Sequence, residues 1–303
     1  MTPIRRCALV TRFADVRAAD SAVVLSRHLA GRGIEVVAPE EESPRLGDIA
    51  ARYIPEATLA DSADLVVAIG GDGTLLYAAG LVAQAAGLVA GRRVPLLGVN
   101  RGRLGFLTDV MPEDMLASVD AALAGDCARD ERPLLAAEIR TAAGGSAGGL
   151  ALNDVVLQKR QSGHLVDFET WIGGRFINTH GGDGLVVATA TGSTAYALSC
   201  GGPIVEPGLD VLVVAPICPH TLSDRPIVVP GSADIEVRLV DRPDSFAEVS
   251  CDGRALGSLA PGDRLTIRPA AARITLLHPP GYDYYRLLRS KLNWGRRAFD
   301  TPA

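Results

Sequence analysis

The 303-residue chain is long enough for one large domain or two moderate ones, and its 48% hydrophobic residues can fill buried cores, which excludes a disordered or fibrous protein. Its net charge of −5 excludes a general attraction to nucleic acid or anionic lipid, because that attraction comes from clustered Lys and Arg. No apolar run reaches the roughly 18 residues of a membrane span, and no secretion signal opens the chain, so we expect a cytoplasmic protein without nucleic-acid or membrane partners.

Residues 1–125 alternate between predicted strands and predicted helices. The strands are Arg6–Val10, Ile34–Ala38, Leu65–Ile69 and Val94–Val99. The helices are Asp20–Ala30, Leu75–Ala86 and Pro112–Ala124. Such alternation is typical of a parallel sheet covered by helices, so we expect a Rossmann-like α/β domain over residues 1–125.

After Arg132 the sequence changes to short segments rich in Val, Ile, Leu and Thr, separated by Gly, Pro and Asp. The predicted strands are Leu134–Arg140, Leu150–Lys159, Val166–Ile172, Leu185–Ala188, Val211–Ala215, Ile227–Val229, Ile235–Leu239, Leu265–Arg268 and Ile274–Leu277. This spacing predicts a β-rich, sandwich-like domain over residues 126–279. Apolar residues at helix-like intervals in Gly281–Phe299 predict a last helix, within a segment 280–303 that packs back on the first domain.

The clearest local signal is Leu65–Leu76, where an apolar strand leads into a glycine turn and then into a helix. Ligands of open α/β sheets bind at such junctions, yet the turn has neither the Lys of a P-loop nor a full G-x-G-x-x-G. Asp72 inside the turn would repel phosphate unless a proton transfer or a cation uses it. It therefore suits a general base for phosphoryl transfer, with Mg²⁺ screening the donor phosphates. Alternatively, Asp72 only caps the helix that follows.

Two further segments could contact a nucleotide. In Asp183–Ser199 a strand leads into a Gly/Ser/Thr turn and a predicted helix from Ala195, and Tyr196 offers a flat face on which a base could stack. The turn hydroxyls belong to Thr191, Ser193 and Thr194, which could equally be ordinary helix caps. The adjacent Asn153 and Asp154 could grip the vicinal hydroxyls of a ribose or form a strand-entry turn.

The motifs, in this order, resemble those of bacterial NAD kinases from Leu65 nearly to the C-terminus. They are GGDGT at Gly70–Thr74, NRGRLGFLTD at Asn100–Asp109, LND at Leu152–Asp154, DGLVVATATGSTAY at Asp183–Tyr196, GGPIVEP at Gly201–Pro207, PICPHTLSDRPIVVP at Pro216–Pro230 and HPPGYDYYRLLRSKLNW at His278–Trp294. GGDGT alone also occurs in lipid kinases and in relatives of 6-phosphofructokinase. The ordered combination is specific to the NAD kinase family.

The resemblance implies an enzyme that phosphorylates the 2′-hydroxyl of the adenosine ribose of NAD with ATP and Mg²⁺, giving NADP. It implies that Asp72 activates this hydroxyl and that Asn153 and Asp154 hold ribose and base. Asp183 would hold the nicotinamide end, and His164 would be a basic contact. The phosphate side would comprise Gly70, Gly71, Gly73 and Thr74, and the NAD contacts Thr191, Thr194, Ala195, Tyr196, Ala197, Leu198 and Ser199. The family also implies a homodimer or homotetramer, and we assign no protein side chain to the metal.

Three positions depart from the family pattern. Ala190 replaces a turn proline, and Arg254 stands where glutamine is frequent. Gly181 stands where many ATP-restricted members have Arg, so the choice between ATP and polyphosphate as the donor stays open. Two other functions stay open. A lipid or sphingoid-base kinase would use the same GGDGT motif, and a non-catalytic sensor of NAD would not need Asp72.

Overall fold

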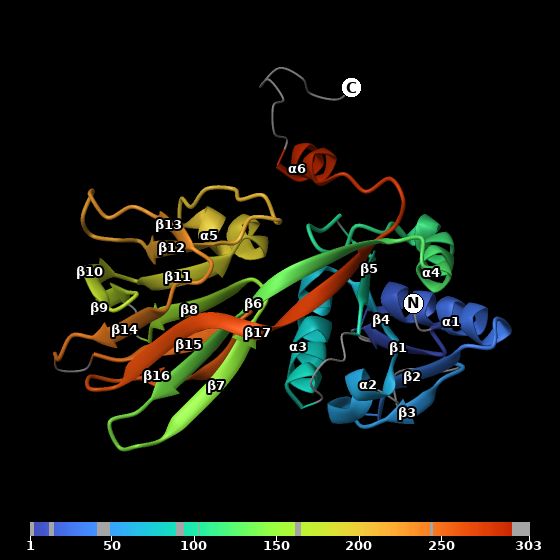
Figure 1. The fold of residues 1–303 in the computed structure, drawn as a ribbon, viewed down its shortest axis with the longest axis horizontal. Coiled ribbons are helices and arrows are strands. Elements are labelled where there is room, and N and C mark those ends of the chain that lie inside the picture. The colour runs from blue at the N-terminus through green and yellow to red at the C-terminus, as the bar shows by residue number, and fades with distance from the viewer. Residues whose placement is uncertain are drawn as a thin grey trace. The chain divides into compact units, whose positions relative to one another are not determined.

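The structure is a computed structural model that describes residues 3–11, 15–40, 49–88, 94–102, 104–160, 165–242 and 245–292 (Figure 1). It divides into two compact units. Unit 1 comprises Met1–Glu131 and Ile274–Ala303, and unit 2 comprises Arg132–Arg273. No helix in the described ranges is both long and apolar enough to cross a membrane.

Unit 1 contains a parallel sheet in the order β5-β4-β1-β2-β3. Its strands are β1 (Arg6–Thr11), β2 (Glu35–Pro39), β3 (Arg52–Ile54), β4 (Leu65–Gly70) and β5 (Leu96–Asn100). Its helices are α1 (Val16–Gly31), α2 (Glu56–Ser62), α3 (Asp72–Leu88), α4 (Met115–Ala124) and α6 (Tyr284–Leu292). This arrangement confirms the expected α/β fold, whereas β3 and α2 were not predicted.

The core of unit 1 forms where the apolar strands meet amphipathic helices. Residues 65–69 of β4 are fully buried, and α1 turns Leu25 and Leu29 toward the same core. Asp15 caps α1 by accepting a hydrogen bond from the Arg17 N–H at 3.0 Å. The chain order of the strands reverses between β1 and β4, so their carboxyl ends form the crevice in which open α/β sheets bind ligands.

Unit 2 is built from antiparallel strands. One sheet has the order β13-β12-β11-β8-β15-β16, and a second group pairs as β10-β9-β14-β17 with the hairpin β6-β7. The first sheet contains β8 (Asp154–Lys159), β11 (Gly184–Thr189), β12 (Val211–Ile217), β13 (Ile227–Pro230), β15 (Ala247–Cys251) and β16 (Arg254–Leu259). The second group contains β6 (Ala128–Arg140), β7 (Ser146–Ala151), β9 (Val166–Ile172), β10 (Arg175–Gly182), β14 (Ile235–Leu239) and β17 (Arg264–His278). Buried residues from both groups share one apolar core, as a β-rich, sandwich-like domain requires.

Several predictions for the chain after Arg132 differ from the structure. The predicted strands Leu265–Arg268 and Ile274–Leu277 are one strand, β17, and β10, β15 and β16 were not predicted. The predicted strand Leu150–Lys159 is broken at Leu152 and Asn153 into β7 and β8. The helix predicted from Ala195 is the single-turn helix α5 (Tyr196–Ser199), and the 3-10 turn η3 (Thr191–Thr194) precedes it. The backbone of Ala195, with φ −97° and ψ −128°, interrupts the helical conformation between them. The last helix begins at Tyr284, and residues 293–303 of the predicted segment lie outside the described residues.

The buried imidazole of His278 links the C-terminal segment to the rest of unit 1 through two aspartates. The side chain of His278 is 3% exposed, and its Nδ1 lies 2.9 Å from Asp109 Oδ2. Its Nε2 lies 3.4 Å from Asp130 Oδ2, and its ring stacks on Tyr282 at 3.8 Å between centroids. Burial opposes the charged imidazole, but the two carboxylates outweigh burial and raise the pKa of His278. Protonated His278 therefore stabilises this junction.

We expect His278→Phe, which keeps an aromatic ring, to lower the free energy of unfolding by about 3 kcal/mol near pH 6, because it leaves two carboxylates without their cation. The pKa of His278 is raised on folding. The extra free energy of unfolding that His278 gives the wild type is therefore complete below about pH 6.5, and it declines as pH rises through the pKa of His278 in the folded protein. Urea unfolding at pH 6 and pH 9 measures both effects. The control is His28→Gln, which removes a more exposed pair with Asp120 and should cost less than about 1 kcal/mol. A cost that is equal at both pH values would contradict the prediction.

Candidate active site

The glycine loop Gly70–Thr74 lies at the carboxyl end of β4, beside the point where the strand order reverses. The N–H groups of Thr74 and Leu75 donate to the Gly71 carbonyl. These hydrogen bonds form the first turn of helix α3. Gly70 is required for space, because a Cβ there would lie 2.3 Å from Thr74 Oγ1. The loop therefore exposes its backbone in the position where α/β proteins bind phosphate.

The Asp72 carboxylate is held by four donors of the segment that follows β5. Oδ2 accepts the Phe106 N–H at 2.7 Å. Oδ1 accepts the Leu107 N–H, the Thr108 N–H and the Thr108 hydroxyl, each at 3.0 Å. Two carboxylate oxygens offer about four lone-pair sites, so Oδ1 is saturated and Oδ2 retains one site. Asp72 thus ties the glycine loop to a distant segment, in addition to opening α3.

Two residues position the carboxylate: Gly105 in this segment, and Asn100 at the end of β5. A Cβ on Gly105 would lie 1.9 Å from Asp72 Oδ1, so only glycine leaves room for the carboxylate. The buried Asn100 donates from Nδ2 to Thr108 Oγ1 at 3.0 Å and accepts the Gly102 N–H at 2.7 Å. The Thr108 hydroxyl is thereby oriented to donate to Asp72. The sequence motif contained these residues, but we had given neither Gly105 nor Asn100 a role.

A cavity of about 260 Å³ adjoins the glycine loop. It is lined by Asp15, Arg17, Ala18, Ile69, Gly70, Gly71, Gly73, Thr74, Arg101 and Gly102. Its walls contain the Arg17 and Arg101 side chains, the Asp15 carboxylate that pairs with Arg17, and glycine backbone, so one net positive charge and backbone N–H groups face an anionic group. The Arg101 N–H donates to the Gly70 carbonyl at 2.9 Å, and Arg101 Nε donates to the Arg17 carbonyl at 3.0 Å. Arg17 was missed by the sequence analysis, because its position far from the motif gives no signal.

In unit 2, Asn153 precedes β8 and Asp154 begins it, and their backbone N–H groups donate to a second carboxylate, that of Asp252. Asp252 accepts the N–H groups of Leu152, Asn153 and Asp154 at 2.7, 2.8 and 3.1 Å. Its backbone has φ 48°, a conformation that Asp tolerates in the tight Asp-Gly turn between β15 and β16. Burial and the neighbouring Asp252 raise the pKa of Asp154 to about 7. Such perturbed carboxyl groups concentrate at functional sites.

We expect Asp154→Asn to stabilise the fold more at pH 8 than at pH 5. The pKa of Asp154 is raised on folding to about 7, so the unfolded chain binds fewer protons between about pH 4 and pH 7 and stability falls as pH rises through that window. Asn removes this cost, which grows by roughly 3 kcal/mol between pH 5 and pH 8, since two pH units lie between pH 5 and the folded pKa and each corresponds to about 1.4 kcal/mol. Urea unfolding at both pH values tests it, with Asp210→Asn as a control for an exposed aspartate. Equal changes at pH 5 and pH 8 would contradict the assignment.

The turn between β11 and α5 uses its inner hydroxyls for its own structure. Ser193 donates to the Ala190 carbonyl at 2.7 Å, and the buried Thr191 hydroxyl accepts from Arg132 Nη1 at 3.0 Å. Gly192 lets the turn approach β8, because a Cβ there would lie 2.2 Å from the Asn153 carbonyl oxygen. The hydroxyls of Thr191 and Ser193 are thus used internally. Of the other expected NAD contacts, Ala197 is buried, and Thr194, Ala195, Tyr196, Leu198 and Ser199 are partly or fully exposed.

Asp183 is half-buried and forms an ion pair with Lys159, 2.7 Å between Oδ1 and Nζ. Two residues earlier, a Cβ on Gly181 would meet Asp167 Oδ1 at 2.8 Å. The preceding His180 is buried and pairs with Asp224, which ties β10 to the segment after β12. Lys159 and Asp224 were not identified from the sequence. His164 lies outside the described residues, and Arg254 opens β16 beside the Asp252 turn.

Both parts of the chain match domains of one known protein family. Residues 8–127 match the ATP-NAD kinase N-terminal domain, and residues 152–278 match the ATP-NAD kinase C-terminal domain. NAD kinases of Pseudomonas paraeruginosa and Ectopseudomonas mendocina are 39% and 40% identical over 297 residues, covering 98% of this chain and 98% of each relative. The chain belongs to the NAD kinase family. The motif resemblance is therefore confirmed, and the enzyme is an NAD kinase.

Solved structures agree in fold. The structure of an NAD kinase from Archaeoglobus fulgidus in complex with ATP has a TM-score of 0.72 and 26% identity, covering 94% of this chain and 99% of that one. The yeast NADH kinase complexed with NADH has a TM-score of 0.89 and 23% identity, covering 99% and 91%. The shared architecture extends over both units of the enzyme.

Proposed function

We propose that the enzyme transfers the γ-phosphoryl group of ATP directly to the 2′-hydroxyl of the adenosine ribose of NAD, with Asp72 Oδ2 as the general base. The observation that carries this proposal is the asymmetric hydrogen bonding of Asp72, in which Oδ1 accepts three donors and Oδ2 accepts one. The remaining lone-pair site on Oδ2 can receive the hydroxyl proton while the other bonds keep the carboxylate in place.

In this mechanism the ribose oxygen attacks the γ-phosphorus as its proton passes to Oδ2. The bond between the γ-phosphorus and the β–γ bridging oxygen breaks, and ADP leaves with that bonding electron pair. Phosphoryl transfer depends mainly on positioning and charge neutralisation, and the Arg17 and Arg101 cavity offers positive charge beside the glycine loop. Mg²⁺ bound to the donor would neutralise phosphate charge. The described residues contain no group of three or more metal-ligating side chains, so donor phosphate oxygens would supply most of its ligands.

Unit 2 would hold NAD. The buried Asn153 Oδ1 has no hydrogen-bond partner in the described part of the chain, so an amine or hydroxyl of the nucleotide would satisfy it. Asp154 would accept from the same ribose or base, and the partly exposed Tyr196 would stack on a base. Asp183 would contact the nicotinamide end. These roles predict that changes in this group raise the KM for NAD more than they lower kcat.

The experiment is NADP formation by the purified protein with NAD and Mg²⁺, offered either ATP or polyphosphate. Activity with ATP, and no label retained on the protein from γ-labelled ATP, supports direct transfer. A trapped phosphoenzyme would refute direct transfer, and tight NAD binding without NADP formation from either donor would favour a sensor. Comparing the donors in Gly181→Arg tests whether the small residue at 181 admits polyphosphate. Sedimentation of the same protein would test the expected dimer or tetramer, and fractionation of cells the expected cytoplasmic location.

A further inference from the structure

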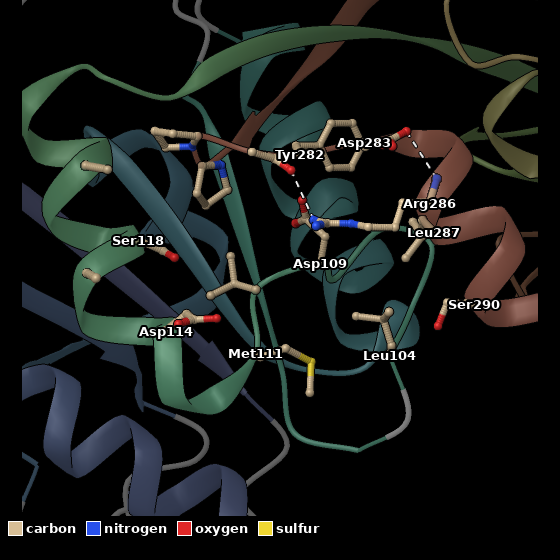
Figure 2. Close-up of a pocket in the computed structure, with 16 residues that line it drawn as sticks. Leu104, Asp109, Met111, Asp114, Ser118, Tyr282, Asp283, Arg286, Leu287 and Ser290 are labelled. Atoms are coloured by element: carbon tan, nitrogen blue, oxygen red, sulfur yellow. Dashed lines mark hydrogen bonds between the residues drawn. The ribbon is translucent and has the colours of Figure 1, made fainter. Parts of the chain in front are cut away.

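Unit 1 contains a second cavity, of about 630 Å³, that the proposed reaction does not use. Figure 2 shows it between the segment after β5, helix α4 and the C-terminal segment that leads into α6. Apolar side chains form much of its wall, among them Leu104, Val110, Met111 and Leu287. Its volume lies within the range of cavities that bind small organic molecules.

A buried carboxylate points into this cavity. The side chain of Asp109 is 9% exposed, and its Oδ2 lies 2.9 Å from His278 Nδ1. Its Oδ1 is buried and has no hydrogen-bond partner among the residues that the structure describes. Figure 2 shows the Asp109 carboxylate near the middle of the cavity, facing the C-terminal segment. A buried acceptor left without a donor is costly, so this oxygen requires one from an occupant.

The charges around the cavity favour a cationic donor. Two further carboxylates, those of Asp114 and Asp283, belong to its lining, against one lysine or arginine side chain among the lining residues, Arg286. The Asp283 Oδ1 accepts the N–H groups of Tyr285 and Arg286, and its Oδ2 lies 3.8 Å from Arg289. The Arg286 guanidinium donates to the Gly281 carbonyl at 3.0 Å. Asp109 is already paired with protonated His278 through Oδ2, so a cationic donor would complete the hydrogen bonding of its Oδ1, and the exposed Asp114 and Asp283 carboxylates would disfavour an anion.

We propose that this cavity is a binding site for a small organic cation, an amidinium or primary amine on a compact apolar body, whose N–H groups donate to Asp109 Oδ1. The apolar wall would receive the body of the ligand, and Asp114 and Asp283 would add attraction at longer range. The site has no need of the glycine loop, so its binding test is independent of the kinase mechanism.

A ligand in the cavity would also affect the position of the Asp72 carboxylate. Leu104 and Asp109 line the cavity, and the residues between them are those that hold the Asp72 carboxylate through Phe106, Leu107 and Thr108. A ligand that fixes Asp109 therefore fixes the segment that positions Asp72. We expect such a ligand to change kcat while leaving the KM for NAD nearly constant. This second step rests on the proposed role of Asp72, and the binding step does not.

The binding experiment compares benzamidine with its neutral analogue benzamide by calorimetry on the full-length protein. Benzamidine should bind about tenfold or more tightly, because hydrogen bonds to charged groups are the stronger ones. Asp109→Asn should remove this preference. Ser118→Leu, which adds volume from the cavity wall on α4 without changing charge, should weaken both ligands. Equal binding of the two ligands, or benzamidine binding that survives both substitutions in folded protein, would overturn the proposal.

The activity experiment then separates the two steps. Benzamidine that binds as expected and shifts kcat by twofold or more, in the wild type but not in Ser118→Leu, supports coupling to Asp72. Binding without any change in kcat would refute the coupling and leave the site. Loss of NADP formation in Asp72→Asn with benzamidine binding intact would show that the two sites are separable.

Discussion

We expect Asp72→Asn to lower kcat for NADP formation by a factor of about 10³ and to leave the Kd for NAD within about threefold, since positioned general bases contribute factors of about 10² to 10⁴. Asn has one carboxamide oxygen, which can keep the three bonds of Oδ1. Its amide nitrogen then faces the Phe106 N–H, and the lone-pair site that would receive the ribose proton is gone. Steady-state kinetics with ATP and NAD, beside equilibrium NAD binding, measures both quantities.

The control for Asp72→Asn is Thr108→Val, which removes one donor to Oδ1 and leaves Oδ2 and its remaining lone-pair site unchanged. It should lower kcat by less than about tenfold, because the carboxylate still accepts three backbone N–H groups. If both variants lost the same activity, Asp72 would act by holding the 106–108 segment rather than by taking a proton. Retention of more than a tenth of kcat in Asp72→Asn would exclude the general-base role.

The sequence predicted those parts of the fold that depend on neighbouring residues. The apolar run Leu65–Ile69, followed by two glycines, reads as a buried strand ending in a ligand-binding turn, and β4 and its loop have that arrangement. Strand β3 was missed because its three residues are too few to show alternation. The predicted helix from Ala195 is present only as the single turn α5, and the Ser193 hydroxyl before it bonds Ala190 and Val205 instead of capping a longer helix.

The candidate site depends on residues that meet only in the folded chain. Asp252 lies 100 residues from Leu152, whose N–H it accepts, and Arg17 lies 84 residues from Arg101, which donates to its carbonyl. Nothing in the local pattern of an Asp-Gly turn or of a helix start indicates these partners. The motifs identified Asp72 and Asp154, whereas the groups that hold Asp72 in place or raise the pKa of Asp154 required the tertiary structure.

Gly105→Ala should lower kcat by a factor of about 10², although the residue carries no functional group. A Cβ at this position would lie 1.9 Å from Asp72 Oδ1 and 2.4 Å from Thr108 Oγ1, so the carboxylate and the segment must separate. A displacement of about 1 Å at the reacting groups is sufficient for a loss of this size. Kinetics of NADP formation tests it, with Gly31→Ala as the control, because a Cβ at Gly31 meets no atom within 4 Å. A loss below about threefold in Gly105→Ala would show that the segment accommodates the methyl group.

The double variant decides whether Gly105→Ala acts through Asp72. If the added methyl group lowers kcat by displacing the Asp72 carboxylate, it should cost little in a chain that already carries Asp72→Asn, because residues acting as one unit are strongly non-additive. Independent effects would instead multiply, and the double variant would fall a further factor of about 10² below Asp72→Asn. Urea unfolding of all four proteins checks that the comparison is between folded enzymes. Non-additivity in kcat together with additivity in the free energy of unfolding would place the role of Gly105 in positioning Asp72 rather than in stability.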